Sequence, residues 1–223
     1  MFLRLLKIEN DKNVIREIPF HKGINLIVDE TNSDNEQESG NNVGKTTAIR
    51  LIDFCLGGKG KNIYQDQEFK SKGNNLIENF LKNNNIIITL VLKEDLDIPN
   101  SREITIRRNF LIRKEKIQEI NGEQYNDENF KIKLKELIFH SDKLKPTFRQ
   151  LIAKNIRDEK NRLVNAVKVL HFNTTADEYE PLYLFWLGID LDDADKKQRL
   201  LSQKKIEENL QKRLRKESNL SQI

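Results

Sequence analysis

The sequence predicts an α/β fold: an α+β lobe with a mixed sheet over residues 1–190, followed by the start of a coiled-coil helix over residues 191–223. Short runs of β-branched and apolar residues before residue 109 are typical of strands. Helical periodicity dominates after residue 126. From Asp192 onward the chain has no Gly, Pro or aromatic residue and is highly charged, as expected of a long exposed helix.

The apolar runs predict five strands, at residues 2–8, 14–20, 24–28, 85–92 and 103–108. Residues 24–28 are apolar enough to be buried on both faces of a sheet. Residues 117–120 lead into Asn121-Gly122, which predicts a hairpin because this dipeptide tolerates the positive φ angles of a type I′ turn.

Helices are predicted at residues 45–56, 127–139, about 147–157 and 181–187. The first has Ile49, Ile52 and Leu56 on one apolar stripe and ends at the glycines from Gly57 onward. The last is apolar all round, which indicates a buried helix.

The C-terminal segment resembles the beginning of a coiled coil that the chain does not complete. Leu200, Leu210 and Leu214 fall on a and d heptad positions, although Gln203 and Glu207 interrupt the seam.

The composition excludes several classes. Hydrophobic residues make up 37% and charged residues 33%, and the net charge of +4 permits contact with nucleic acid without requiring it. Cys55 is the one cysteine, so no internal disulfide forms, and the three histidines have no zinc spacing. We expect a cytoplasmic protein without a signal peptide or membrane segment.

The informative motif is the run Ser39-Gly40-Asn41-Asn42-Val43-Gly44-Lys45-Thr46-Thr47. A phosphate loop has the form G-x-x-x-x-G-K-[ST], and Gly44, Lys45 and Thr46 supply its last three defining residues. Ser39 departs from the first glycine, and Gly40 lies one position later. A predicted strand precedes the run and a predicted helix begins at Lys45, as a phosphate loop requires.

These residue types suit a nucleoside triphosphate, most simply ATP. Gly44 lets successive backbone N–H groups point at phosphate oxygens, and the following helix directs its N-terminal dipole at the same anion. Lys45 neutralises the β- and γ-phosphates, and the Thr46 hydroxyl ligates Mg²⁺. The alternative is a strand, loop and helix that carry Gly-Lys-Thr by chance.

Asp29 and Glu30 end the predicted strand at 24–28 and are similar to a Walker B motif. That strand leads into the phosphate loop, however, whereas a Walker B motif belongs on another strand. The preferred interpretation is that Asp29 and Glu30 begin an acidic loop over residues 29–39, and the Walker B interpretation stays open.

Four runs together resemble a known family: residues 2–10, 18–28, 41–47 and 51–57. They are similar to the N-terminal head lobe of ABC-type P-loop ATPases of the SMC class (structural maintenance of chromosomes), which includes RecF- and RecN-like relatives. The resemblance is closest to SMC-like ATPases of bacterial three-component anti-phage or conflict systems. It covers residues 2–60 well and 85–190 only as an order of elements.

This resemblance implies ATP and Mg²⁺ as ligands and a role on DNA in repair or phage defence. It implies a C-terminal lobe, or a second head in a homodimer, that supplies the signature and Walker B motifs. By this resemblance the chain is expected to be an N-terminal fragment or half of a longer protein. Without these motifs it is not expected to hydrolyse ATP alone. Gln150 is the best candidate for a Q-loop residue near the nucleotide and Mg²⁺, against the alternative of an exposed glutamine on an ordinary helix.

A basic stripe is a second candidate site, for duplex DNA phosphates, with a solvated strand face as the equal alternative. It comprises Arg102, Arg107, Arg108, Arg113, Lys114 and Lys116.

Two alternative functions are predicted for the whole chain. It is either the head lobe of such an ATPase, or a nucleotide-sensing module that binds ATP without turnover and controls assembly through its C-terminal helix.

Overall fold

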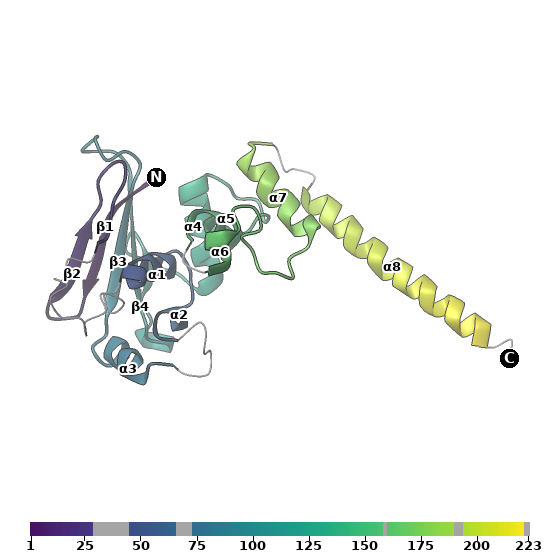
Figure 1. Ribbon diagram of the computed structural model, residues 1–223, viewed down its shortest axis with the longest axis horizontal. Helices are drawn as coiled ribbons and strands as arrows, with labels where there is room; N and C mark the ends of the chain where they lie inside the picture. The colour runs from purple at the N-terminus through teal and green to yellow at the C-terminus, as the bar shows by residue number, and fades with distance from the viewer. Residues whose placement is uncertain (29–44, 66–72, 158–159, 190–193, 221–223) are drawn as a thin grey trace.

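The computed structural model describes residues 1–28, 45–65, 73–157, 160–189 and 194–220 (Figure 1). Its sheet has six strands in the order β2-β1-β3-β4-β5-β6, and all neighbouring strands are antiparallel. The α/β class is confirmed, but the sheet that was expected to be mixed is antiparallel over the described residues. The strands are β1 (Phe2–Glu9), β2 (Val14–Pro19), β3 (Ile87–Lys93), β4 (Glu103–Asn109), β5 (Gln118–Ile120) and β6 (Glu123–Gln124).

Strand β3 is central and buried along most of its length. Its Leu90 lies opposite Leu6 of β1 and Ile106 of β4, and none of these three side chains is exposed. Facing residues of adjacent strands share one side of the sheet, so they form a row across the core. The β5–β6 turn has Asn121 and Gly122 at φ +52° and +85°, as the type I′ prediction requires.

The helices gather on one side and at one end of the sheet (Figure 1). Helix α1 contacts β3 and β4, and α4 contacts β5 and α5. The helices are α1 (Lys45–Cys55), α2 (Lys61–Tyr64), α3 (Asn75–Asn83), α4 (Asp127–Phe139), α5 (Phe148–Asn155), α6 (Lys160–Val164), α7 (Ala176–Trp186) and α8 (Ala194–Leu220), with a 3-10 turn η2 (Arg113–Glu115).

Side-chain caps set where several helices begin. Asn126 accepts hydrogen bonds from the backbone N–H groups of Glu128 and Asn129 and starts α4 at the predicted residue. Helix α7 begins at Ala176, five residues before the predicted helix, and contains Pro181. The predicted start at residue 181 is wrong, because Thr175 and Glu178 form a capping box that begins the helix before the proline.

Two apolar clusters form the interior. The larger joins the sheet to α1 and α4, and the smaller joins α5 to α7 around Leu151 and Leu182. Phe139 connects them, because its ring centroid lies 5.9 Å from those of both Phe185 and Trp186. The all-round apolar composition predicted a buried helix, and this prediction is wrong for the end of α7: Trp186 is partly exposed, and Leu187 just beyond it is mostly exposed.

Helix α8 projects away from this body (Figure 1). The predicted heptad residues Leu200, Leu210 and Leu214 are exposed along it. An ion pair of 2.6 Å between Lys197 and Glu180 of α7 joins its first turns to the body, and both side chains are well exposed.

We predict that deletion of residues 194–223 leaves the body intact. Exposed ion pairs contribute little to stability, so the melting temperature should change by less than about 2 °C. Thermal unfolding followed by circular dichroism at equal protein concentration measures this. A fall of about 10 °C would show that α8 contributes to the folded core.

Candidate functional site

Helix α1 follows the predicted phosphate loop and begins at Lys45, as the motif requires. Thr46 and Thr47 are exposed in its first turn. The first four N–H groups of a helix have no partner within the helix. The start of α1 therefore combines these N–H groups with two exposed hydroxyl side chains, which is the combination that a phosphate group binds.

The loop before α1 lies outside the described residues, and so does the side chain of Lys45. The loop geometry and the Walker B alternative therefore stay predictions. The residues concerned are Ser39, Gly40, Asn41, Asn42, Val43 and Gly44 of the loop, and Asp29 and Glu30 of the alternative.

Arginine side chains hold the other end of α1. Arg149 of α5 donates two hydrogen bonds to the carboxylate of Asp53, at 2.7 and 3.0 Å, and a third to the carbonyl of Leu56 at 2.9 Å. Asp53 is only 4% exposed. A bidentate pair of this kind is strong and directional, and the positive charge complements the negative end of the helix dipole. Arg149 thus fixes α1 against α5.

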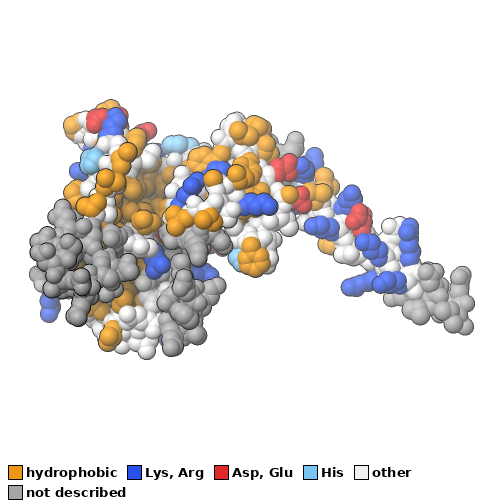
Figure 2. All heavy atoms as spheres, in the orientation of Figure 1, with side chains coloured by type: hydrophobic (Ala, Val, Ile, Leu, Met, Phe, Trp, Pro, Cys, Tyr) orange, Lys and Arg blue, Asp and Glu red, His pale blue; other side chains and the backbone are white. Residues whose placement is uncertain are grey.

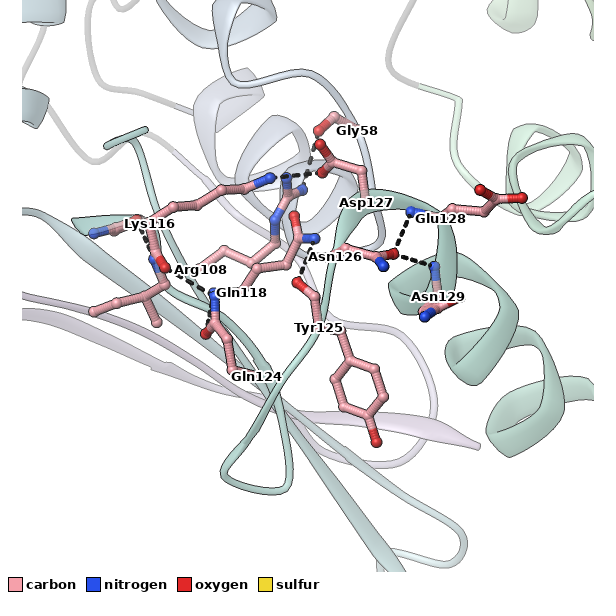
Figure 3. A network of polar contacts seen from close by, with 12 residues as sticks. Gly58, Arg108, Lys116, Gln118, Gln124, Tyr125, Asn126, Asp127, Glu128 and Asn129 are labelled. Carbon is pink, nitrogen blue, oxygen red and sulfur yellow. Dashed lines mark hydrogen bonds and ion pairs between the residues drawn. The ribbon is translucent and has the colours of Figure 1, made fainter. Parts of the chain in front are cut away.

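Arg108 of β4 completes this anchor (Figure 3). Its Nη1 donates to the carbonyls of Phe54 and Gly58, the latter at 3.1 Å, and its guanidinium lies 4.2 Å from the centroid of the Phe54 ring. Arg108 is 8% exposed, and this burial lowers its pKa from the ordinary arginine value. It therefore caps the carbonyls at the end of α1 from beneath.

The predicted basic stripe is not a continuous surface. Arg108 points into the core beneath α1, whereas Arg107 lies on the opposite face of β4 and pairs with Glu119 at 2.9 Å. Lys116 pairs with Asp127 at 2.7 Å. Because successive strand residues point to opposite faces, one strand cannot direct Arg107 and Arg108 at the same duplex.

The predicted buried strand at residues 24–28 is wrong. These residues form no strand, and Ile24 and Leu26 are 80% and 79% exposed. No described strand lies beside them to supply hydrogen bonds, and Asn25 holds a local turn by accepting from the N–H of His21 and donating to its carbonyl. The apolar run alone therefore does not make a strand here, because a strand also needs a neighbouring strand for its backbone hydrogen bonds.

A cavity of about 650 Å³ lies between this segment, the start of β1 and the outer face of α1. Thr46 at the start of α1 contributes to its wall, which places the cavity beside the predicted phosphate site. Ile49 also lines it and is partly exposed, although it was expected on the buried stripe of α1 with Ile52 and Leu56.

Gln150 occupies the capping box at the start of α5. Its Oε1 accepts hydrogen bonds from the Thr147 N–H at 2.7 Å and the Thr147 hydroxyl at 3.1 Å. Both lone pairs of this oxygen are engaged, so Gln150 must leave the cap before it can coordinate Mg²⁺. A role near the metal stays a prediction, and the capping role is what the structure provides.

Cys55 of α1 is a fully buried core residue. Burial raises the pKa of its thiol to about 12, so the thiol is unionised at neutral pH and is not a nucleophile.

Among the described residues, no group of three or more His, Cys, Asp or Glu side chains could hold a metal ion. None of the described helices combines the length and apolar character needed to cross a membrane.

Comparisons with known proteins add no relatives: neither a protein-family model nor a curated protein sequence matches this chain.

The Asp53–Arg149 pair was not predicted from the sequence. The available signal was an aspartate on the apolar helix before Gly57, but its partner lies 96 positions away and only the fold brings the two together.

We predict a pH dependence of stability from Cys55. The unfolded thiol ionises near pH 9, whereas the folded thiol keeps its proton up to about pH 12. The unfolded state therefore binds fewer protons in this range, and the free energy of unfolding should fall by about 1 kcal/mol between pH 8 and pH 10. Urea unfolding at both values should show this decrease, and a Cys55→Ala variant should lose that part of it.

We predict that Thr147→Ala and Gln150→Ala each lower the free energy of unfolding by about 1 kcal/mol, because each removes half of the capping box. Urea unfolding measures the loss. Thr147→Ala should leave Mg-ATP affinity unchanged. A weaker Mg²⁺ dependence of ATP binding in Gln150→Ala alone would support the metal role, and equal behaviour of the two variants would limit Gln150 to capping.

Proposed function

We propose that this chain binds Mg-ATP as the N-terminal head lobe of an SMC-like ABC-type ATPase acting on DNA. The observation that supports it is the start of α1 at Lys45 of the Gly-Lys-Thr-Thr run. The free N–H groups of the first turn and the helix dipole favour a triphosphate at this point. In this proposal Lys45 neutralises the β- and γ-phosphates, and Thr46 ligates the metal.

The exposed apolar surface beside this helix supports a partner lobe. Residues 24–28 and the neighbouring cavity present apolar side chains where the chain passes from β2 toward α1. Figure 2 shows hydrophobic side chains gathered on the part of the molecule near the N-terminus. Contiguous apolar surface of this kind marks an interaction site. We assign it to the C-terminal ATPase lobe, which would supply a strand beside residues 24–28 and the motifs for hydrolysis.

The contact with DNA is better placed on α8 than on the sheet. Figure 2 shows Lys and Arg side chains along this helix. Exposed basic residues bind backbone phosphates without reading the sequence, and a projecting helix can lie along a duplex. They include Lys196, Lys197, Arg199, Lys204, Lys205, Lys212, Arg213, Arg215 and Lys216.

A second candidate is a nucleotide-sensing module that assembles through α8 without turnover. It is favoured by the exposure of Leu200, Leu210 and Leu214, which present an apolar seam to a partner helix. Phosphate release separates the two functions when it is measured with Mg-ATP, DNA and any separately encoded lobe. Turnover above background supports the ATPase, and binding without turnover supports the sensor.

We predict that Lys45→Ala raises the Kd for Mg-ATP by at least about 100-fold, because the phosphates lose their charge-assisted partner. Equilibrium titration with a fluorescent ATP analogue measures the affinity, and circular dichroism checks the fold. Thr46→Ala should weaken the dependence on Mg²⁺ more than the binding of metal-free ATP.

The matched control is Lys133→Ala. Lys133 is an ion-paired surface lysine of α4, and its loss makes the same change in net charge. This variant should bind Mg-ATP like the unaltered chain. Unchanged affinity in Lys45→Ala, or an equal loss in both variants, would contradict the proposal.

A further inference from the structure

A second cavity, of about 410 Å³, lies at the opposite end of α1 from the predicted phosphate loop. Its walls come from the glycine-rich segment after α1, strands β4 and β5, and the first turns of α4. Part of this arrangement is visible in Figure 3. The charged residues that line it are the cations Lys59, Lys61, Arg108, Lys116 and Lys131, with Asp127 as the acidic residue among them.

The deepest cation is Arg108, which is more than nine-tenths buried. Its Nη1 is engaged by the carbonyls of Phe54 and Gly58, but its buried Nε has no hydrogen-bond partner among the described residues. Buried N–H groups are nearly always paired. Arg108 lines the cavity, and a buried cation whose hydrogen-bonding capacity is only partly used favours an anion beside it.

Asp127, the one acidic residue among the described residues that line the cavity, does not neutralise this charge. Asp127 accepts a hydrogen bond from Lys116 at 2.7 Å, which lowers the pKa of its carboxyl group. Within the described part of the chain, the remaining lysines, Lys59, Lys61 and Lys131, have no ion-pair partner. Among the described lining residues, four lysines and one arginine therefore face one carboxylate, which is an excess of positive charge.

Two of the glycines that border the cavity pack closely around α1, and at Gly58 this packing excludes a side chain. A Cβ at Gly58 would lie 2.1 Å from Oδ2 of Asp53, and one at Gly60 would lie 3.1 Å from the Phe110 ring. The lysines between and after these glycines have no such role. Lys59 is exposed and Lys61 opens the short helix α2, so neither contributes to the core.

We propose that this cavity is a second anion site, which binds the terminal phosphate or diphosphate group of a small phosphorylated ligand. It is distinct from the predicted ATP site, because α1 has 11 residues and its two ends are separated by about 16 Å. Bound there, a phosphate would contact both the end of α1 and the start of α4, and so would link their positions.

The depth of the cavity favours a small ligand over a nucleic acid. Arg108 lines the cavity together with Gly58, Phe130 and Gln118, and all four residues are buried, so a ligand contacts Arg108 by entering this recess. A terminal phosphate carries two charges at the end of a molecule and can enter first. A phosphodiester in a duplex is flanked by sugars on both sides and contacts surface lysines instead.

The test is calorimetric titration of inorganic pyrophosphate into the full chain carrying Lys45→Ala, which silences the predicted ATP site. Binding with a Kd below about 1 mM is expected, weakening as salt is raised. Adding Lys61→Ala and Lys131→Ala should weaken binding by at least about tenfold. Both side chains lie outside the core clusters, so these variants should keep the fold, which thermal unfolding verifies.

Two further variants sharpen the result. Lys133→Ala, two residues from Lys131 on α4, changes the net charge equally but lines no part of the cavity, and it should bind pyrophosphate normally. Asp127→Asn removes the competing carboxylate and should tighten binding by a few-fold.

Three outcomes would overturn the proposal. The first is no pyrophosphate binding at 1 mM, and the second is an equal loss of affinity in Lys133→Ala and Lys131→Ala. The third is displacement of pyrophosphate by a duplex oligonucleotide whose own affinity depends equally on Lys61 and Lys131, which would assign the surface to nucleic acid. The Lys45→Ala background keeps these outcomes separate from failure of the proposed ATP site.

Discussion

The position of α1 depends on two arginines that bind the end of the helix opposite the predicted phosphate loop. Arg149 donates hydrogen bonds to Asp53 and to the carbonyl of Leu56. Arg108, on the sheet, donates hydrogen bonds to the carbonyls of Phe54 and Gly58. A helix end buried without partners would leave several carbonyls unsatisfied. With both arginines present, α1 is tied to β4 and to α5, and its free end projects in a fixed direction.

The chain consists of a packed core and of exposed surfaces that are candidates for partner binding. The packed core is the antiparallel sheet with α1 and α4 against it. The surfaces are the exposed apolar segment at residues 24–28, the projecting helix α8, and the cationic cavity beside Arg108. We propose a different binding partner for each surface: a second ATPase lobe for residues 24–28, DNA for α8, and a phosphorylated small ligand for the cavity.

Local sequence signals predicted most of the elements, because these signals act within a few residues. The cap at Asn126 and the Asn121-Gly122 turn gave the correct start of α4 and the correct hairpin. The start of α1 followed from Gly44-Lys45, although the loop itself stays untested. Predictions failed where the decisive contact was distant or was not found. No strand of the described ranges lies beside residues 24–28, and Arg108 turns inward to cap a helix formed some 50 residues earlier.

The 27 residues of α8 extend over about 40 Å at the ordinary rise of a helix. An ion pair at its base joins it to α7, and Phe139 packs α7 against the rest of the body. A helix of this length amplifies small rotations at its base. A turn of about 10° at its base would move its far end by roughly 7 Å, from the same geometry. Small rearrangements around α7 would therefore be magnified into displacements large enough for a partner molecule to sense.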